Sequence, residues 1–342
     1  MTAVFVMGGS VTGGGGVSDN VTRAWPALLG FPTTIHYKNA IEPSYFLHCP
    51  ERFSAMRGPY RAVVLDFGPN MWSTDAPRHL ASLVYIAAQL SNASRVGLVA
   101  WPRRRHLSDV KRIQEVARAT GAFAIAFPVN NSLYSDDVHP NAHGHALIAD
   151  HVKEFLLSPA LGEVSPRGSM TNRDEMCFPD ARKMPIVENT GWRLVDGGRA
   201  TRAKFGWAPQ EIGGVLELKL SVPAAHCGAI VTLSYLRTPE NGDLHIRCDC
   251  QCRPIRGYHQ RHVHPFPHVR TRIVGSLRVT DTTSFTMLAN ESRACHVLLS
   301  GQKTRVDSVY VRDAHKDDVT NARVSTHPLD RQFATRALQR CS

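Results

Sequence analysis

Asp136 and His139 stand three residues apart in the segment Asp136-Asp137-Val138-His139-Pro140. At this spacing the Asp136 carboxylate can accept the Nδ1 proton of His139, so that Nε2 can face a serine hydroxyl. Pro140 biases His139 toward an extended backbone, which helps to present the ring from a loop. Taken alone, such a pair is more often a surface turn with a solvated histidine. The interpretation therefore depends on whether a serine lies nearby in the fold.

Ser10 is the candidate serine, because it follows an apolar run (residues 3–7) and precedes four glycines at positions 13–16. Such a loop can turn tightly and expose the hydroxyl at the carboxyl edge of a sheet, where α/β proteins bind ligands. A glycine-rich loop after a first strand can also cradle phosphate. The segment lacks the Lys-Ser/Thr of a P-loop, the G-x-G-x-x-G spacing and the second glycine of G-x-S-x-G. On this segment alone, nucleotide binding and a serine nucleophile both stay open.

Gly68-Pro69-Asn70 follows the apolar segment Val63-Val64-Leu65-Asp66-Phe67, which is typical of a central strand. The Asn70 amide is thus expected at the same sheet edge as Ser10. A neutral donor there can stabilise the oxyanion of an acyl-transfer intermediate, an interaction worth about 3 to 4 kcal/mol. An isolated G-P-N segment is an ordinary turn. Together with Ser10 and the Asp136 and His139 pair, it indicates acyl-transfer chemistry.

The elements that must position these side chains alternate between short apolar runs and amphipathic stretches. Strands are predicted at residues 3–7, 33–37, 62–67, 95–100 and 123–127, and helices at residues 78–90, 107–119 and 143–157. Strands that alternate with helices predict a parallel sheet covered on both faces. Residues 1–157 are therefore expected to form an α/β domain.

In order and spacing, Gly8-Gly9-Ser10, Gly68-Pro69-Asn70 and the Asp136 to His139 segment resemble the three motifs of the SGNH (GDSL-type) hydrolase family. The resemblance covers about 155 residues and implies a flavodoxin-like three-layer α/β/α fold. It also implies that Ser10 is the nucleophile, His139 the general base and Asp136 its orienting partner. The oxyanion hole would comprise the Ser10 backbone N–H, the Asn70 amide and Gly68, without a metal or cofactor.

Two positions depart from the family pattern. Gly9 replaces the Asp of the GDSL motif, but that Asp is not the triad carboxylate. In the second motif, where the family offers a glycine N–H to the oxyanion, residues 38–44 (KNAIEPS) contain no glycine. Another N–H can substitute only if its residue accepts the required dihedral angles. One oxyanion donor is therefore unassigned.

The second half of the chain has a different hydrophobic pattern from the first. Residues 158–170 (SPALGEVSPRGSM) are rich in Pro, Gly and Ser and are interpreted as a linker. Beyond them, alternating runs at residues 215–220, 229–236, 276–279 and 296–299 are separated by turn residues, which predicts a mainly β, sandwich-like domain over residues 171–311. Gly191-Trp192, Gly206-Trp207 and Gly213-Gly214 loosely resemble the β-sandwich of some algal and plant SGNH-type proteins. Residues 312–342 are expected to form a polar C-terminal tail.

Three cysteines in this half form the pattern Cys248-x-Cys250-x-Cys252. Histidines follow at positions 259, 262, 264 and 268, which raises the alternative of a zinc site. The cysteine spacing differs from the usual C-x₂₋₄-C of such sites. Because alternate residues of one strand point the same way, disulfide bonds to Cys177, Cys227 or Cys295 are favoured over zinc.

Aromatic residues of the second half could stack on sugar rings, and the candidates are Trp192, Trp207, Tyr235 and Tyr258. Large aromatic side chains more often fill the core of a domain. We therefore favour core positions for them.

The net charge of +11 indicates anionic surroundings, and 43% hydrophobic residues exclude global disorder. Basic runs lie at residues 103–105 and between residues 253 and 272. No recognisable RNA- or DNA-binding motif accompanies them, so nucleic acid is disfavoured, whereas an acidic polysaccharide or a solvated surface explains the charge. No run reaches the length of a membrane-spanning helix, and the N-terminal residues lack the pattern of a secretory signal. No membrane segment is expected in this chain, and the compartment stays open.

These features predict a serine esterase or O-acyltransferase that acts on small acyl esters, acetyl esters of carbohydrates above all. The acyl group would form on Ser10 and pass to water or to a sugar hydroxyl, and the sequence does not choose between the two. A catalytically impaired carbohydrate-binding protein is the main alternative, supported by the missing glycine of residues 38–44. A basic nucleic-acid-binding protein is the third hypothesis.

Overall fold

The computed structural model divides the chain into two compact units, Met1–Met170 and Thr171–Ser342, which are described separately. The structure describes residues 3–18, 22–39, 41–47, 55–71, 76–91, 93, 95–104, 106–128, 130–158, 162–164, 175–178, 180–196, 205–221, 229–237, 243–254, 268–270, 279–288, 294–302 and 305–313. No helix within these residues is long and apolar enough to cross a membrane.

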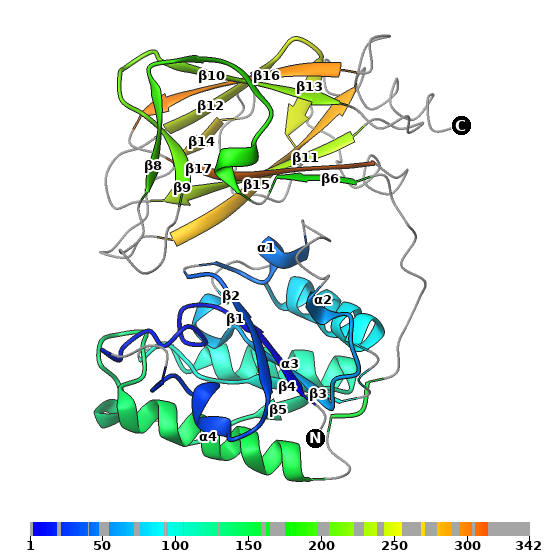
Figure 1. The fold of residues 1–342 in the computed structure, drawn as a ribbon, viewed down its shortest axis with the longest axis vertical. Coiled ribbons are helices and arrows are strands. Elements are labelled where there is room, and N and C mark those ends of the chain that lie inside the picture. Colours follow the sequence, from blue (N-terminus) through cyan, green and yellow to red (C-terminus); the bar gives the residue numbers. More distant parts are fainter. Residues whose placement is uncertain are drawn as a thin grey trace. The chain divides into compact units, whose positions relative to one another are not determined.

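The first unit is built on a five-stranded sheet (Figure 1). Its strands are β1 (Val4–Gly8), β2 (Thr33–Tyr37), β3 (Ala62–Asp66), β4 (Val96–Val99) and β5 (Phe123–Ile125). All neighbours pair in parallel, in the order β2-β1-β3-β4-β5. This is the flavodoxin-like order, with a topological switch point at the carboxyl ends of β1 and β3.

Helices cover both faces of this sheet and form separate cores with it. They are α1 (Ser44–Leu47), α2 (Ala76–Ser91), α3 (Ser108–Thr120) and α4 (Ala142–Leu157), with short 3-10 turns at Ala27–Leu29, Gly68–Asn70 and Asn131–Leu133. One core joins Phe5 of β1 to Leu83 of α2 and Ile113 of α3. The other joins Val6, the next residue of β1, to Val152 of α4. Because consecutive strand residues face opposite sides, β1 is buried on both faces, and the predicted three-layer α/β/α fold is confirmed.

Three residues of the segment that was expected to be a linker, residues 162–164, contact the first unit. The Gly162 carbonyl accepts a hydrogen bond from the Val96 backbone N–H, at 2.9 Å. Glu163 forms an antiparallel bridge with Arg95, and Val164 is buried in the core with α2 and α3. Residues 162–164 therefore pack on the sheet, because an apolar Val164 gains more by burial than by exposure in a linker.

The second unit consists of two antiparallel sheets, as predicted for a β-sandwich (Figure 1). One sheet has the order β14-β12-β16-β10-β7, and the other β13-β15-β11-β17-β9-β8, with β6 paired to β17. The strands are β6 (Glu175–Phe178), β7 (Ile186–Thr190), β8 (Trp192–Asp196), β9 (Phe205–Pro209), β10 (Val215–Ser221), β11 (Ala229–Arg237), β12 (Asp243–Cys248), β13 (Gln251–Pro254), β14 (His268–Arg270), β15 (Val279–Leu288), β16 (Ala294–Gln302) and β17 (Arg305–Asp313), with a 3-10 turn at Ala181–Lys183. The last strand ends at Asp313, two residues beyond the boundary expected at residue 311. Residues 314–342 of the expected tail lie outside the described residues.

Alternate residues of these strands fill one core between the sheets. Leu216, Leu218 and Leu220 of β10 are fully buried there. Trp192 and Tyr235 belong to the same core, at 4% and 3% exposure, so neither presents a face to a sugar ring. The indole Nε1–H of half-buried Trp207 donates to the Ala181 carbonyl. Tyr258 lies outside the described residues.

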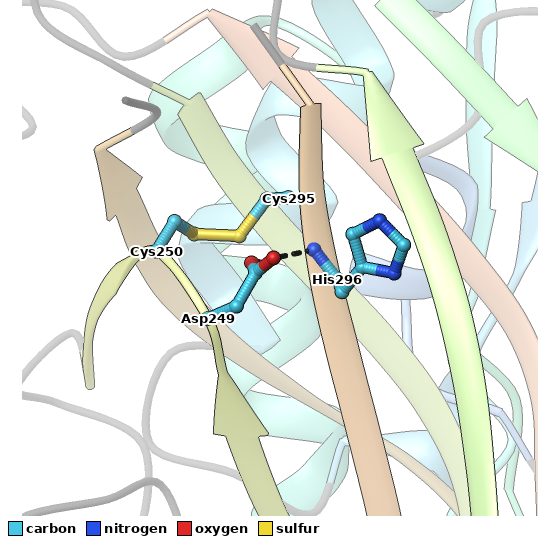
Figure 2. The surroundings of a disulfide bond; sticks show 4 residues. All are labelled: Asp249, Cys250, Cys295 and His296. Carbon is cyan, nitrogen blue, oxygen red and sulfur yellow. Dashed lines mark hydrogen bonds between the residues drawn. A yellow bond between two sulfur atoms is a disulfide. The ribbon is translucent and has the colours of Figure 1, made fainter. Parts of the chain in front are cut away.

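The spacing of the cysteine triplet suggested a single strand, but the three cysteines do not lie on one strand. Strand β12 ends at Cys248, the chain turns at Asp249 and Cys250, and β13 begins in the other sheet. Cys250 forms a disulfide bond with Cys295 of β16, one of the three predicted partners, and the Asp249 carboxylate accepts the backbone N–H of His296 (Figure 2). The disulfide therefore anchors the crossing between the sheets.

This disulfide also bears on the zinc alternative. Cys248, Cys250 and Cys295 are the one group of possible metal ligands among the described residues, and their sulfur atoms lie within 4.8 Å of one another. Two of these sulfurs are joined to each other, and Cys248 is also disulfide-bonded, so none of the three is a thiolate. The side chains of Cys227, Cys252 and the four histidines at positions 259 to 268 lie outside the description.

Replacing both Cys250 and Cys295 by Ala is expected to lower the unfolding free energy of the second unit by about 2 to 4 kcal/mol. The disulfide closes a loop between cysteines 45 residues apart. A cross-link across a loop of this length lowers the conformational entropy of the unfolded chain and so stabilises the folded one. Denaturant unfolding of the full chain measures the effect. Ser221→Ala, at the exposed end of β10, is the control, and an unchanged midpoint in the double variant would contradict the anchoring role.

Candidate active site

Ser10 lies in the turn that follows β1, at the carboxyl edge of the sheet. Backbone hydrogen bonds close this turn on itself: the Gly13 N–H donates to the Gly9 carbonyl, Gly14 N–H to Val11, and Gly15 N–H to Ser10. Gly14 and Gly16 have φ angles of 78° and 95°, which other residues rarely adopt. The glycines therefore form a tight loop that leaves the Ser10 side chain partly exposed.

A line of hydrogen bonds connects the three residues predicted for nucleophilic chemistry. His139 Nε2 lies 2.9 Å from Ser10 Oγ, across 129 residues of sequence. His139 Nδ1 lies 2.7 Å from Asp136 Oδ2. Since a carboxylate only accepts, Nδ1 carries the proton toward Asp136, and the neutral ring then offers Nε2 as an acceptor for the Ser10 hydroxyl. The structure brings these three side chains together in the order that activates a serine.

Hydrogen bonds keep the Asp136 carboxylate ionised, and its side chain is 54% exposed. The desolvation that remains would by itself raise the pKa of Asp136. The His139 side chain and the backbone N–H groups of His139 and Val138, both 2.7 Å from Oδ1, outweigh this desolvation and hold the pKa below its usual range. The carboxylate is therefore charged at neutral pH, as needed to orient His139 and to stabilise its protonated form.

The loop that carries Asp136 and His139 is held by residues that follow β4. The indole Nε1–H of buried Trp101 donates to the Val138 carbonyl at 3.0 Å, and the Arg104 backbone N–H donates to the Asp137 carbonyl at 2.8 Å. Motif spacing alone did not identify Trp101, although its place just after an apolar strand puts it at the edge where the site is expected. These contacts fix the loop's backbone between Asp136 and His139.

Asn70 lies beside the residue that precedes Ser10. Its side chain is 3% exposed, and a Cβ atom added to Gly9 would lie 2.5 Å from Asn70 Oδ1 and 3.3 Å from Nδ2. The glycine at position 9, where the family has Asp, thus permits the close approach of the Asn70 amide. The Ser10 backbone N–H makes no hydrogen bond within the described part of the chain, so no acceptor there competes for this predicted donor.

Gly68 and residues 38–44 are constrained by packing. A Cβ atom at Gly68 would overlap the carbonyl of Trp101, so glycine is needed there for the close contact between the ends of β3 and β4. The Lys38 backbone N–H donates to the Gly8 carbonyl and is not available to an oxyanion. Lys38 Nζ lies 2.6 Å from Tyr45 Oη. Ala40 of the same segment lies outside the described residues.

Asp66, the last residue of β3, is a buried acid that the motif analysis did not assign to the site. Its Oδ2 accepts hydrogen bonds from Thr12 Oγ1 at 2.8 Å and from the Trp25 indole at 3.0 Å, and its Oδ1 has no partner among the residues that the structure describes. Burial raises the pKa of Asp66 to about 6, and the two hydrogen bonds only partly oppose this. A charged residue ending a run of Val and Leu was the signal in the sequence that pointed to it.

Asp66→Asn is expected to change how stability depends on pH. The folded-state pKa of about 6 lies above the ordinary 3.8, so the stability that protonated Asp66 contributes is complete below about pH 3.8 and is lost as pH rises through 6. The amide keeps an acceptor for Thr12 and Trp25 but never ionises. The compared quantity is the unfolding free energy of the variant minus that of the wild type. As the pH rises from about 3.5 to about 8, this difference should therefore increase by about 3 kcal/mol.

Denaturant unfolding of the full chain at the two pH values measures this difference. Asp150→Asn, on the exposed surface of α4, is the matched control and should show no such gain. Parallel pH dependence of wild type and Asp66→Asn would show that Asp66 is as solvated in the folded chain as in the unfolded one.

Known proteins show only distant similarity to the chain. No family model and no curated protein matches it. Among solved structures, a protein of the G-D-S-L family from Desulfitobacterium hafniense matches 45% of this chain and 99% of its own, at 14% identity and a TM-score of 0.37. A GDSL-like lipase from Parabacteroides merdae matches 45% and 95%, at 12% identity and a TM-score of 0.36. A carbohydrate-binding module of Cellvibrio mixtus lichenase 5A, in complex with cellotriose, matches 41% and 98%, at 9% identity and a TM-score of 0.27.

Proposed function

We propose that the first unit is a serine ester hydrolase or O-acyltransferase that uses Ser10 as its nucleophile. The observation that carries the proposal is the continuous line from Ser10 Oγ through His139 to the Asp136 carboxylate, with distances of 2.9 and 2.7 Å. Serine side chains are weak nucleophiles unless a base takes the proton. The loop after β1 and the loop before α4 supply the serine and the base at one sheet edge, the usual place for ligands in this fold.

The reaction proceeds in two steps on this geometry. Ser10 Oγ attacks the ester carbonyl while its proton passes to His139 Nε2, and Asp136 stabilises the imidazolium that forms. The Asn70 amide and the Ser10 backbone N–H donate to the carbonyl oxygen as it gains negative charge. The C–O bond to the leaving alcohol then breaks, and His139 returns the proton to that alcohol. Water or a second alcohol repeats the sequence in reverse and releases the acyl group from Ser10.

We extend the proposal to small acyl esters of carbohydrates, acetyl esters above all. This extension is supported by the second unit, since two-sheet antiparallel sandwiches are an architecture that lectin domains share. The basic run at residues 103–105 makes acidic glycans reasonable substrates, because Arg104 is exposed and its backbone contacts the loop of Asp136. Arg103 is engaged instead by buried Asp109, at 2.9 Å.

The test is a screen of p-nitrophenyl esters from acetate to octanoate, followed by acetylated neutral and acidic polysaccharides. We expect turnover to be highest for acetate. An added sugar alcohol that forms a new ester indicates transfer, whereas release of acetate alone indicates hydrolysis. Absence of turnover and of labelling by a fluorophosphonate would reject the proposal in favour of an impaired, carbohydrate-binding protein.

A further inference from the structure

The glycine segment (residues 13–16) lies directly against the His139 ring. A Cβ atom added to Gly15 would overlap His139 Cδ2 and lie 2.9 Å from Nε2. A Cβ atom added to Gly16 would lie 2.9 Å from His139 Cβ and would overlap the Pro140 carbonyl. The backbone of the glycine segment therefore contacts the ring beside the nitrogen that faces Ser10, and no side chain fits between them.

His145 supports this segment. Its Nε2 lies 3.0 Å from the Gly15 carbonyl, and its Nδ1 lies 3.3 Å from the Trp25 backbone N. A carbonyl only accepts and an amide N–H only donates, so these partners require the neutral ring with its proton on Nε2. His145 is fully buried, and burial lowers its pKa, which keeps it in this neutral form.

Hydrogen bonds connect His145, through Trp25 and Asp66, to Thr12 near Ser10. Trp25, whose backbone donates to His145, donates its indole N–H to Asp66. Asp66 also accepts the hydroxyl of Thr12, two residues after Ser10. His145 thus joins the first turn of α4 directly to Gly15 and, through Trp25 and Asp66, to Thr12 of the loop that presents the nucleophile.

We propose that His145 is a positioning residue, whose hydrogen bond to Gly15 holds the glycine segment against the His139 ring and keeps Nε2 of His139 directed at Ser10. The inference rests on the proposed function and adds a residue outside the triad to it. Without the hydrogen bond the loop can withdraw from the ring, His139 gains freedom to rotate, and proton transfer from Ser10 slows. Misplacement by about 1 Å can cost about 10²-fold in turnover.

Two substitutions at position 145 separate positioning from packing. His145→Leu removes the donor, and we expect kcat for the acetyl ester to fall by about 10²-fold with little change in KM. His145→Gln can place its amide N–H near the Gly15 carbonyl, and we expect it to recover at least about tenfold of that loss. His143→Leu, at an exposed position on the same helix, is the matched control and should retain wild-type kinetics.

Gly15→Ala tests the same contact from its other side. The added methyl group would overlap the His139 ring, so kcat should fall as in His145→Leu although His145 itself is intact. Wild-type kcat in folded His145→Leu, or equal kcat in the Leu and Gln variants, would overturn the proposal. If His145→Leu does not fold, wild-type kcat in Gly15→Ala would do the same.

A nuclear magnetic resonance measurement separates this inference from the proposed function. The Nδ1 proton shared by His139 and Asp136 should give a downfield signal in the wild type, and we expect it to shift or broaden in His145→Leu and Gly15→Ala. An unchanged signal in both variants overturns the positioning role whatever the activity. A wild-type protein with this signal but without turnover of any ester would reject the proposed function instead.

Discussion

Ser10→Ala is expected to lower ester turnover by about 10³-fold or more, because removal of the nucleophile leaves only binding and oxyanion stabilisation. The side chain is partly exposed and small, so its loss should leave the unit folded. Initial rates with the acetyl ester measure the effect. Labelling by a fluorophosphonate, which reacts with activated serines, should disappear in parallel.

The matched control is Ser82→Ala on α2, a serine whose hydroxyl donates to the Arg78 carbonyl of the same helix. It should keep wild-type turnover and labelling. Equal labelling of the wild type and the Ser10→Ala protein would mean that another residue reacts, and the assignment of Ser10 as nucleophile would be wrong.

Asn70→Ala should reduce kcat by about 10² to 10³-fold while KM changes little, since an oxyanion donor binds the transition state more strongly than the ground state. Asn70→Asp is the sharper variant, because it keeps the size of the side chain beside Gly9 but replaces the N–H donors by acceptors. Steady-state kinetics of both variants, with circular dichroism to confirm folding, measure the effect. If only KM rose, Asn70 would belong to substrate binding, and full activity of Asn70→Asp would exclude it as a donor.

The α/β unit was predictable because its strands are short, apolar and buried on both faces. Strand β2 has the bounds predicted from sequence, and the other four strands differ by one or two residues at one or both ends. The Ser10, Asn70 and His139 motifs each follow or precede such an element, so the parallel order of the sheet brings them to one edge. The local strand and helix patterns therefore agree with the arrangement of the folded unit. Such agreement is typical of a sequence that specifies one fold.

The parts that could not be predicted depend on contacts between distant side chains. The bonds of Trp25 to Asp66 and to His145 span 41 and 120 residues, and no spacing rule connects such positions. Likewise, the alternate cysteines at positions 248 and 250 suggested one strand, because period-two spacing does not reveal a turn between two sheets. These hydrogen bonds and this turn depend on packing between segments that are distant in the sequence.

The sequence separation of 129 between Ser10 and His139 determines when activity can emerge during synthesis. The serine is made early, but its base comes just ahead of α4, whose Val152 and Ile148 complete one core of the sheet. Contacts of such long sequence separation form late, since the intervening chain must first be ordered. A ribosome-bound chain that ends before α4 would therefore carry Ser10 and Asn70 without a reactive serine, and labelling by a fluorophosphonate would report the moment at which the last helix docks.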